Sequence, residues 1–469
     1  MKYNLAELSI ICDGELVNCS APEQTFIELF STDTRKNCSK SLFVALAGEN
    51  FDSHDFLDKA VEAGAIALCV NRAKLAKVAN TKNIPLLVVD DTLRAYQNIA
   101  RHHRRKIAPK ILALTGSSGK TSTKEILAAI LRRIYGDEAV YATQGNTNNH
   151  VGVPQNLLNL HEKHKLAIIE MGTNHFGEIE TLSNIAEPDI GIIVSIGNAH
   201  LEFLRDTDGV ATEKSAIFAK MNPKGTAIFP AECPGLHIIE EKTANFKKLR
   251  FGLDSCPKYC DIRIKYHGST LQGSKFELIL QNPQKSVTIE WPLLGKHQVL
   301  NAAAAVLGAM ATGADFESAA NALSKGVEIP GMRMRFENKD GIVIINDAYN
   351  ANPDSVRAGI EWLAEALSNE EKNRTVHVIL GDMLELGESS LQKHREVLDF
   401  AFKKLPAAKF TTVGKNMLEA VKSLNVEKVS LKTYANSDSA REIVKQFVPG
   451  DIVYLKGSRG IALEKIFAK

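Results

Sequence analysis

Two glycines, a lysine and several hydroxyl side chains stand together in one short segment, Thr115-Gly-Ser-Ser-Gly-Lys-Thr121. An apolar run, 111–114, comes directly before it, and apolar residues at helical spacing follow from Ile126. Glycines let the backbone N–H groups of such a loop point at an anion, and the positive end of the next helix adds to the attraction. The sequence therefore predicts a strand, a loop that binds a nucleoside triphosphate, and a helix.

The whole loop is a candidate phosphate site, comprising Thr115, Gly116, Ser117, Ser118, Gly119, Lys120 and Thr121. Lys120 would reach the β- and γ-phosphates, and the Thr121 hydroxyl would hold Mg²⁺. The common motif, G-x-x-x-x-G-K-T, requires a glycine where this chain has Leu114, so the loop is a shorter variant. A glycine-rich turn without a ligand is the alternative, but the apolar run before the loop and the Gly-Lys-Thr string disfavour it.

Two further apolar runs end in residues that bind metals. The run 166–169 leads into Glu170, and the run 192–196 leads toward His200. Because ligands collect at the carboxyl ends of strands in an open parallel sheet, both side chains could face the phosphate loop. A capping carboxylate and a core histidine are the alternatives for each residue alone. Their shared position after a strand favours a divalent metal site beside Thr121.

Amide and hydroxyl side chains gather in a second loop, 143–154, which contains Thr143, Asn146, Asn148 and Asn149. Such groups offer donors and acceptors together, which suits a sugar or a peptide backbone. A plain solvated loop is an equally good interpretation. Polar residues also follow apolar strands at 347–353 and 381–387, where a ligand cleft would form.

At 469 residues the chain exceeds the size of one core. Apolar strands that alternate with helices predict parallel sheets covered on both faces, with strands at 111–115, 166–170, 190–196, 342–346, 375–380, 409–413 and 451–455. Between about 225 and 292 the apolar period changes to two, which predicts an antiparallel flank. An alanine-rich helix is expected at 301–311.

We therefore predict an α/β protein of three domains. Residues 1–91 would form a small α/β domain, with a strand at 41–48 and a helix and strand within 60–70. Residues 92–328, which open with a helix at 93–105, would form the central P-loop domain with its antiparallel flank. Residues 329–469 would form a doubly wound, Rossmann-like domain. Hinges are expected near residues 91 and 329.

Composition argues against several classes of partner. The formal net charge of +2 gives no electrostatic reason to expect binding to nucleic acid or to an anionic membrane. No apolar stretch approaches the roughly 18 residues of a membrane span, and the first residues lack a signal-peptide core. Seven scattered cysteines without a C-x-x-C pair indicate reduced thiols rather than a zinc site. We expect a cytoplasmic protein.

Taken together, these segments resemble the Mur ligases of bacterial cell-wall synthesis, nearly from end to end. Three strings resemble members that add D-alanyl-D-alanine to UDP-N-acetylmuramoyl-tripeptide: 145–154, 347–353 and 380–387. The sister ligase that adds the third residue typically carries Tyr-Ala-His-Thr-Pro and Asp-Asn-Pro-Arg strings, and neither occurs in this sequence. That ligase, folylpolyglutamate synthase and a P-loop regulator or motor are the alternative identities.

The resemblance implies an ATP-dependent, ADP-forming amide ligase that works through an acyl phosphate. It implies ATP and Mg²⁺ as cofactors, UDP-N-acetylmuramoyl-tripeptide and D-alanyl-D-alanine as substrates, and a monomer. Its catalytic residues fall on Lys120, Glu170, His200 and Lys214, and its metal ligands on Thr121, Glu170, His200 and Lys214. Lys214 would be carbamylated, whereas without the resemblance it would be interpreted as a solvated helix lysine.

The resemblance also implies adenine contacts at His297 and Asn301, and closure over the phosphates and ribose by Arg333 and Asp347. Thr34 stands where the family usually has a serine, and retains a hydroxyl. Substrate contacts are implied at Ser31, Thr34, Arg35, Thr143, Asn146, Asn148, Asn149, Tyr349, Asn350, Asn352, Lys456, Ser458 and Arg459.

Overall fold

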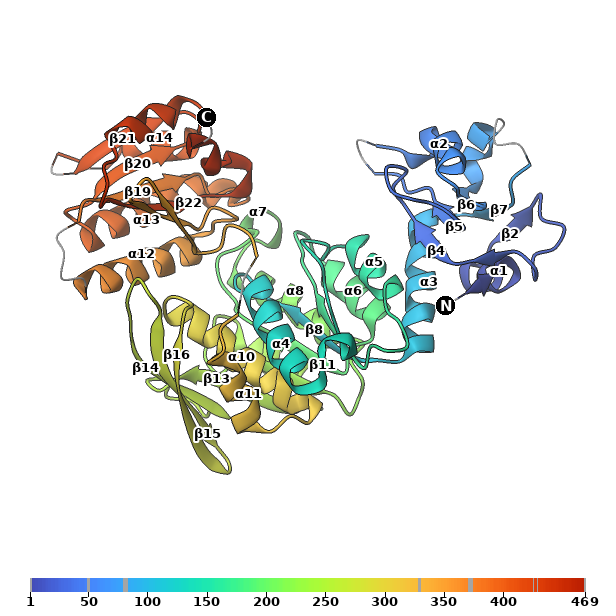
Figure 1. The fold of residues 1–469 in the computed structure, drawn as a ribbon, viewed down its shortest axis with the longest axis horizontal. Helices are drawn as coiled ribbons and strands as arrows, with labels where there is room; N and C mark the ends of the chain where they lie inside the picture. The colour runs from blue at the N-terminus through green and yellow to red at the C-terminus, as the bar shows by residue number, and fades with distance from the viewer. Residues whose placement is uncertain are drawn as a thin grey trace. The chain divides into compact units, whose positions relative to one another are not determined.

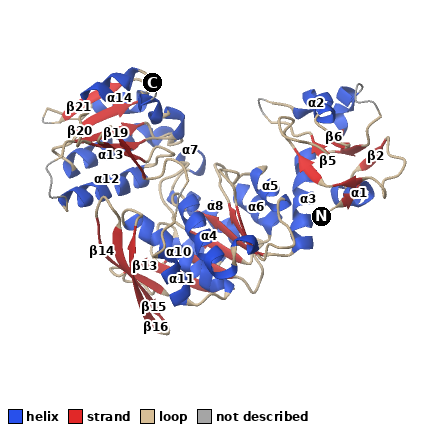
Figure 2. Cartoon of the chain, in the orientation of Figure 1, coloured by secondary structure: helices blue, strands red, loops and turns tan. Residues whose placement is uncertain are grey.

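The structure is a computed structural model that describes residues 2–48, 51–78, 83–327, 330–369, 374–424, 426–427 and 429–467. Helices alternate with the strands of several sheets, so the predicted α/β class is confirmed (Figures 1 and 2). By their internal contacts the residues fall into two units. One contains residues up to 111, 141–169 and 184–187, and the other contains 112–140, 170–183 and 188–469.

The N-terminal part is built on a five-stranded sheet with the order β2-β7-β6-β5-β4, next to a short β1-β3 pair. These strands are β1 (Tyr3–Asn4), β2 (Glu15–Val17), β3 (Phe26–Ile27), β4 (Leu29–Ser31), β5 (Ser41–Val44), β6 (Ala67–Asn71) and β7 (Leu86–Val89). The helices are α1 (Leu5–Cys12), α2 (Leu57–Glu62) and α3 (Thr92–Ile107). The predicted strand and helices are present, and the strand predicted at 41–48 ends earlier, at Val44.

Helix α3 shows why the chain folds this way locally. The Asp91 carboxylate accepts from the backbone N–H groups of Leu93 and Arg94, which satisfies two donors at the helix start. Buried residues recur at helical spacing, including Tyr96 and Ile99, so one face of the helix packs into the hydrophobic core of this part.

The central sheet has nine strands in the order β16-β15-β14-β13-β12-β11-β8-β10-β9. They are β8 (Lys110–Thr115), β9 (Val140–Ala142), β10 (Leu166–Glu170), β11 (Ile190–Ile193), β12 (Thr226–Pro230), β13 (Lys247–Leu253), β14 (Ile262–Ser269), β15 (Ser274–Gln281) and β16 (Gln284–Trp291). The helices are α4 (Lys120–Tyr135), α5 (Gly152–Leu158), α6 (Glu178–Ala186), α7 (Leu201–Leu204), α8 (Thr207–Ser215), α9 (Leu236–Lys242), α10 (Lys296–Thr312) and α11 (Phe316–Leu323).

The predicted antiparallel flank is correct in kind, but its start was predicted too early. Strands β11, β12, β13 and β14 pair in parallel, and antiparallel pairing begins between β14 and β15. Helix α9 lies between β12 and β13, and such a crossover keeps those two strands parallel. Short turns join β14 to β15 and β15 to β16, which forces antiparallel pairing there.

Helix α10 covers the central sheet beside α4. Small side chains, Ala302 to Ala305, and Gly308 allow the two helices to approach closely. A Cβ atom added at Gly308 would lie 3.1 Å from Ile192 and 3.2 Å from Leu127, so a larger residue would require these side chains to shift. The predicted helix at 301–311 is confirmed, and it begins earlier, at Lys296.

The C-terminal sheet has the order β17-β18-β22-β19-β20-β21 and is parallel except at β17. Its strands are β17 (Arg335–Lys339), β18 (Ile342–Asn346), β19 (Val376–Gly381), β20 (Lys409–Val413), β21 (Ser430–Tyr434) and β22 (Ile452–Lys456), with helices α12 (Pro353–Ser368), α13 (Ser390–Lys404) and α14 (Lys415–Val421). The four buried strands were predicted. The two edge strands were missed because their residues are exposed or half-buried and lack an apolar run.

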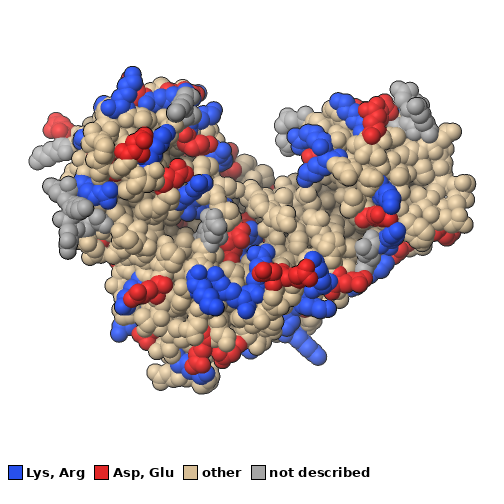
Figure 3. Space-filling view, in the orientation of Figure 1, with Lys and Arg blue, Asp and Glu red and all other residues tan. Residues whose placement is uncertain are grey.

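The division into three domains at residues 91 and 329 stays a prediction, and Ile329 lies outside the described residues. Within the described part of the chain, every helix is too short or too polar to cross a lipid bilayer. On the face drawn in Figure 3, lysines and arginines are interspersed with aspartates and glutamates, as the small net charge suggests.

Candidate active site

The predicted phosphate loop connects β8 to α4. Thr115 ends the buried strand, and Lys120 begins the helix. Between them Gly119 has a φ of 80°, a conformation that favours glycine, and a Cβ atom there would collide with the Asn301 side chain. The loop therefore has the strand, turn and helix that anion binding requires.

The loop is held from one side by the segment after β11. Ser195 Oγ accepts from the Ser118 N–H and donates to the Ser118 carbonyl, both at 2.9 Å. Ser117 Oγ accepts from the Gly197 N–H at 3.0 Å. The sequence analysis missed Ser195, although its position just after a strand was a usable signal. These bonds fix the loop backbone, which matters because its N–H groups would bind phosphate.

Thr121 and Glu170 form the core of a candidate metal site. Thr121 Oγ1 lies 3.3 Å from Glu170 Oε1, and both side chains are buried. Arg333 Nη2 donates to the same Thr121 oxygen at 3.1 Å. The guanidinium carbon of Arg333 lies 3.6 Å from the centre of the Tyr349 ring. Within the described ranges, no three His, Cys, Asp or Glu side chains form a metal cage. Mg²⁺ needs none, since it usually binds one or two protein oxygens plus phosphates and water.

His200 lies just before α7 with a φ of 56°. Its Nδ1 is 2.6 Å from Oε2 of Glu385, which follows β19 in the C-terminal sheet. Burial lowers the pKa of His200, and the charges of Lys120 and Lys214 lower it too, while Glu385 acts to raise it. His200 is therefore biased toward neutral imidazole, the form that binds metals.

Lys214 is the most unusual group in the site. It lies on α8 and is fully buried, and its Nζ has no hydrogen-bond partner among the described residues. Burial lowers the pKa of Lys214 well below its usual range, and Lys120 lowers it further, against the opposing effect of Glu213. The interpretation of Lys214 as a solvated helix lysine is thus wrong, because its side chain is buried and its charged form is disfavoured.

Lys120 Nζ donates to the Gly116 carbonyl at 2.6 Å, across the loop. Burial lowers the pKa of Lys120, Glu170 and Glu385 act to raise it, and Arg333 acts to lower it. A triphosphate in the loop would favour the charged amine. Lys120, Glu170, His200, Lys214 and Arg333 are thus brought into one electrostatic cluster.

Glu213, which the sequence analysis missed, holds the loop that follows Glu170. Its carboxylate accepts from the N–H groups of Gly177 and Ile179, both at 2.7 Å, and from the Thr173 hydroxyl at 3.1 Å. Two of these donors stand at the start of α6, where N–H groups need an outside acceptor. Glu213 therefore joins α8, which carries Lys214, to the start of α6 and to the loop that follows Glu170.

Glu213→Ala is expected to lower the free energy of unfolding by about 2–3 kcal/mol, because several donors lose their acceptor at once. Urea unfolding of the full chain measures this loss. Glu180→Ala, at an exposed position on α6, is the matched control and should change stability by less than about 0.5 kcal/mol. Equal stability of the two variants would contradict the role of Glu213.

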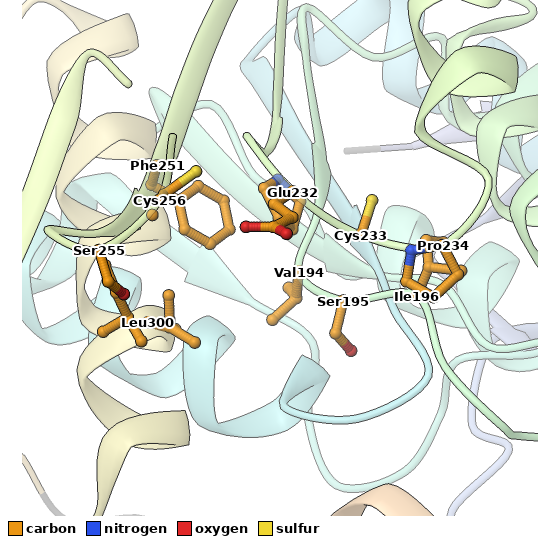
Figure 4. A pocket seen from close by; sticks show the side chains of 13 residues that line it. Val194, Ser195, Ile196, Glu232, Cys233, Pro234, Phe251, Ser255, Cys256 and Leu300 are labelled. Carbon is orange, nitrogen blue, oxygen red and sulfur yellow. The ribbon is translucent and has the colours of Figure 1, made fainter. Parts of the chain in front are cut away.

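A cavity of about 290 Å³ opens beside the phosphate loop, at the carboxyl ends of β11, β12 and β13 (Figure 4). Its lining is largely apolar and includes Val194, Phe251 and Leu300. Ser195, which holds the loop, also lines the cavity. Such a cavity can hold a planar ring close to bound phosphates.

The two predicted adenine contacts stand on the first turns of α10. Asn301 is buried near Gly119 and donates to Gln298 Oε1 at 3.0 Å. Burial lowers the pKa of His297 to about 4, so its ring is neutral at physiological pH. Leu300 lines the cavity, so the helix start, the loop and the cavity are adjacent.

The C-terminal residues form two groups. Asp347 and Lys456 make a partly buried ion pair at 2.7 Å, and Lys456 also donates to the Asn350 carbonyl at 3.2 Å. Ser458 is buried and donates to the Ala351 carbonyl at 3.3 Å. The exposed Arg459 pairs instead with Glu464. Lys456 and Ser458 thus hold the segment 347–353 in place through hydrogen bonds and an ion pair.

Asn352 touches the phosphate loop directly. Its Oδ1 accepts from the Ser355 N–H at 2.8 Å and so caps α12, while its Nδ2 donates to Ser118 Oγ at 3.0 Å. Two residues later, Asp354 accepts from the Asn198 N–H at 2.6 Å. The sequence analysis missed Asp354.

Three of the candidate substrate contacts, Ser31, Thr34 and Arg35, lie at the end of β4 and in the turn after it. Arg35 makes two contacts of 2.9 Å with the Asp33 carboxylate, which lower the pKa of Asp33 to about 2. Ser31 Oγ donates to the Asp33 carbonyl at 3.3 Å, and Thr34 is half-buried between these residues. The segment is a tight turn, and its role in binding stays a prediction.

In the loop 143–154, Thr143 is buried and its N–H donates to the Ile168 carbonyl at 2.9 Å. Asn149 Oδ1 accepts from the Gly152 N–H at 2.9 Å, at the start of α5. Asn148 Nδ2 donates to Asn146 Oδ1 at 3.2 Å. These bonds order the loop, and the choice between a binding loop and a solvated loop stays open.

Two protein-family models match most of this chain. Residues 114–309 match the Mur ligase middle domain, and 332–459 match the Mur ligase, glutamate ligase domain. The UDP-N-acetylmuramoyl-tripeptide–D-alanyl-D-alanine ligase of Haemophilus influenzae is 39% identical over 85% of this chain and 82% of its own.

Two solved structures are similar to this chain over nearly all of its length. MurF from Acinetobacter baumannii has a TM-score of 0.88 and 32% identity, with 100% of this chain and 98% of that chain covered. The MurF ligase from Thermotoga maritima in complex with ADP has a TM-score of 0.77 and 25% identity, covering 93% of this chain and 96% of that chain. The chain therefore belongs to the Mur ligase family.

Proposed function

We propose that this chain joins D-alanyl-D-alanine to UDP-N-acetylmuramoyl-tripeptide and converts ATP to ADP and phosphate. The product is the UDP-muramoyl-pentapeptide precursor of peptidoglycan. The observation that best supports this proposal is the phosphate loop with Thr121, Glu170 and the buried Lys214 beside it. The chain is also similar over most of its length to ligases of this activity.

The chemistry begins with the tripeptide carboxylate, which is a poor acylating agent. Its oxygen attacks the γ-phosphorus of ATP, the bond to ADP breaks, and an acyl phosphate forms. The D-alanyl-D-alanine amine then attacks the acyl carbon, phosphate leaves, and the amine loses a proton. Lys120 and the loop N–H groups hold the β- and γ-phosphates and offset the charge that develops on the transferring group.

Thr121 and Glu170 would hold Mg²⁺ in this reaction, with His200 as a further ligand, and the metal would neutralise phosphate charge. Their short oxygen separation and burial fit such an ion. Lys214 fits a carbamylated ligand: its neutral amine attacks CO₂, an N–C bond forms, and one proton is released. The resulting anion would convert an unpaired buried amine into an oxygen ligand.

The nucleotide would extend from the loop toward α10. Asn301 and His297 would contact the adenine, and the adjacent cavity offers an apolar wall to the ring. Arg333, already bonded to Thr121, would reach the phosphates, and Asp347 the ribose. The remaining candidate residues, in the segments 31–35, 143–149, 349–352 and 456–459, are proposed to contact the other two substrates.

The test is a coupled assay of phosphate release. The ligase requires ATP, UDP-N-acetylmuramoyl-tripeptide and D-alanyl-D-alanine together. Phosphate release should therefore fall to background when either the UDP-N-acetylmuramoyl-tripeptide or the dipeptide is omitted. Rapid hydrolysis of ATP alone would contradict the proposal and favour a P-loop regulator or motor. Parallel assays with diaminopimelate or lysine at the third position identify the accepted tripeptide.

The reaction is proposed to take place in the cytoplasm. All seven cysteines are free thiols, which agrees with a reducing compartment. That the enzyme works as a monomer stays a prediction.

A further inference from the structure

Glu385 is an acidic side chain beside the candidate metal ligand His200, and the mechanism above does not use it. It lies in the loop 382–387 after β19, and its φ of 63° is unusual for a residue with a side chain. The loop is firmly held on both sides of it. The Met383 N–H donates to the buried His394 ring at 2.9 Å, and the Leu384 N–H donates to Ser458 Oγ at 3.0 Å.

The segment 200–202, which faces the loop 382–387, is also held in a fixed conformation. His200 also has a positive φ, 56°, and the Glu202 N–H donates to the Glu385 carbonyl at 3.4 Å. A Cβ atom on Gly387 would lie 3.0 Å from the Cα of Glu202, so the two segments touch through their backbones. Unfavourable conformations at two facing residues cost free energy, and such strain is typically retained where function needs a fixed geometry.

We propose that Glu385 is a positioning residue that engages Nδ1 of His200 and leaves Nε2 as the nitrogen that binds the divalent cation. This inference rests on the proposed function. Nδ1 and Oε2 are 2.6 Å apart, which is ion-pair distance, although the carboxylate does not lie in line with an Nδ1 hydrogen. A carboxylate on one ring nitrogen fixes the tautomer and the orientation of the ring, and makes the other nitrogen a better ligand.

The inference links metal binding to the C-terminal sheet. Glu385 belongs to the loop after β19, whereas His200 follows β11 in the central sheet. The orientation of His200 therefore depends on the loop 382–387 remaining in contact with it. Divalent cation affinity and this contact should be lost together.

Binding of Mn²⁺ alone, followed by electron paramagnetic resonance on the full chain, tests the proposal. Glu385→Ala should weaken Mn²⁺ binding by about tenfold or more, the effect expected for loss of a partner that orients a metal ligand. Glu385→Gln retains an acceptor oxygen and should recover part of this affinity. Glu388→Ala, an exposed acidic residue three positions along the chain, is the matched control and should bind like the unmodified protein.

A second readout separates positioning from a general loss of structure. Nitrogen NMR of the histidine rings in metal-free protein reports the tautomer of His200, whose signal is assigned by its absence in His200→Asn. We expect the Nδ1-protonated tautomer in the unmodified protein and in Glu385→Gln, and a mixed population in Glu385→Ala. An unchanged tautomer and unchanged Mn²⁺ affinity in Glu385→Ala would overturn the proposal.

The two hypotheses fail in different ways. Failure of the ligase activity would appear as absent product with all substrates present, while the tautomer and Mn²⁺ titrations would be unaffected. Failure of the Glu385 proposal would leave the unmodified enzyme fully active.

Discussion

Lys120→Ala is expected to lower kcat by about a thousandfold and to leave the protein folded. The Lys120 amine lies across the phosphate loop, bonded to the Gly116 carbonyl, where it would meet the β- and γ-phosphates. Groups that stabilise charge on a transferring phosphoryl group commonly contribute factors of about 10²–10³ or more. Burial lowers the pKa of Lys120, so the folded protein disfavours the charged amine and the substitution should leave the fold intact.

The measurement is the ligation rate with all three substrates, together with the unfolding midpoint. Lys110→Ala is the matched control, since Lys110 is the exposed first residue of the strand that leads into the loop. It should retain nearly full activity. A folded Lys120→Ala protein that forms product at close to the normal rate would contradict the assignment of Lys120.

Lys214→Met is expected to change activity and stability in opposite directions. The substitution removes a buried amine without a partner and keeps a side chain of similar length. An unsatisfied buried polar group costs about 1–3 kcal/mol, so in CO₂-free buffer the variant should be more stable by about that amount. Ligation should fall by about a hundredfold, because the proposed anionic ligand can no longer form.

The gain in stability should depend on pH. The folded-state pKa of Lys214 is lowered well below 10.5, so below that pH the unfolded chain binds a proton that the folded chain does not. This group therefore destabilises the folded protein as pH falls, and its contribution becomes less unfavourable as pH rises toward 10.5. The stability advantage of Lys214→Met should accordingly shrink over the same range.

Urea unfolding at several pH values measures the difference in stability between Lys214→Met and the unmodified protein. Lys220→Met, at an exposed position shortly after Lys214 in the sequence, is the control. Activity of the unmodified enzyme in CO₂-free buffer should rise when bicarbonate is added. Mass measurement of native protein should detect the added CO₂ on Lys214. Full activity of Lys214→Met, or indifference to bicarbonate with an unmodified amine, would contradict the carbamate.

The phosphate loop could be predicted because its signal is local. A buried strand, two glycines and Gly-Lys-Thr follow one another within a few residues, and each has a separate physical reason to be there. Glu170 was also predictable from its place at a strand end. The strands β17 and β21 were not, because edge strands need no apolar run.

The groups that tune the site could not be predicted, since they come from distant parts of the chain. Glu385 is 185 positions from His200, and only the folded structure brings them within 2.6 Å. Glu213 stands beside Lys214 in the sequence, but its purpose depends on N–H groups at the start of α6. A carboxylate on a helix gives no sign of which donors it will meet.

The side chain of Asn352 divides its two hydrogen-bonding ends between two tasks. The oxygen caps α12, and the nitrogen bonds to Ser118 in the phosphate loop. The helix would thus remain capped if the loop moved away to admit a nucleotide. Asn352 is therefore a reversible contact between α12 and the phosphate loop. Separating the two breaks only the hydrogen bonds of the Asn352 nitrogen, and the capped helix can form them again.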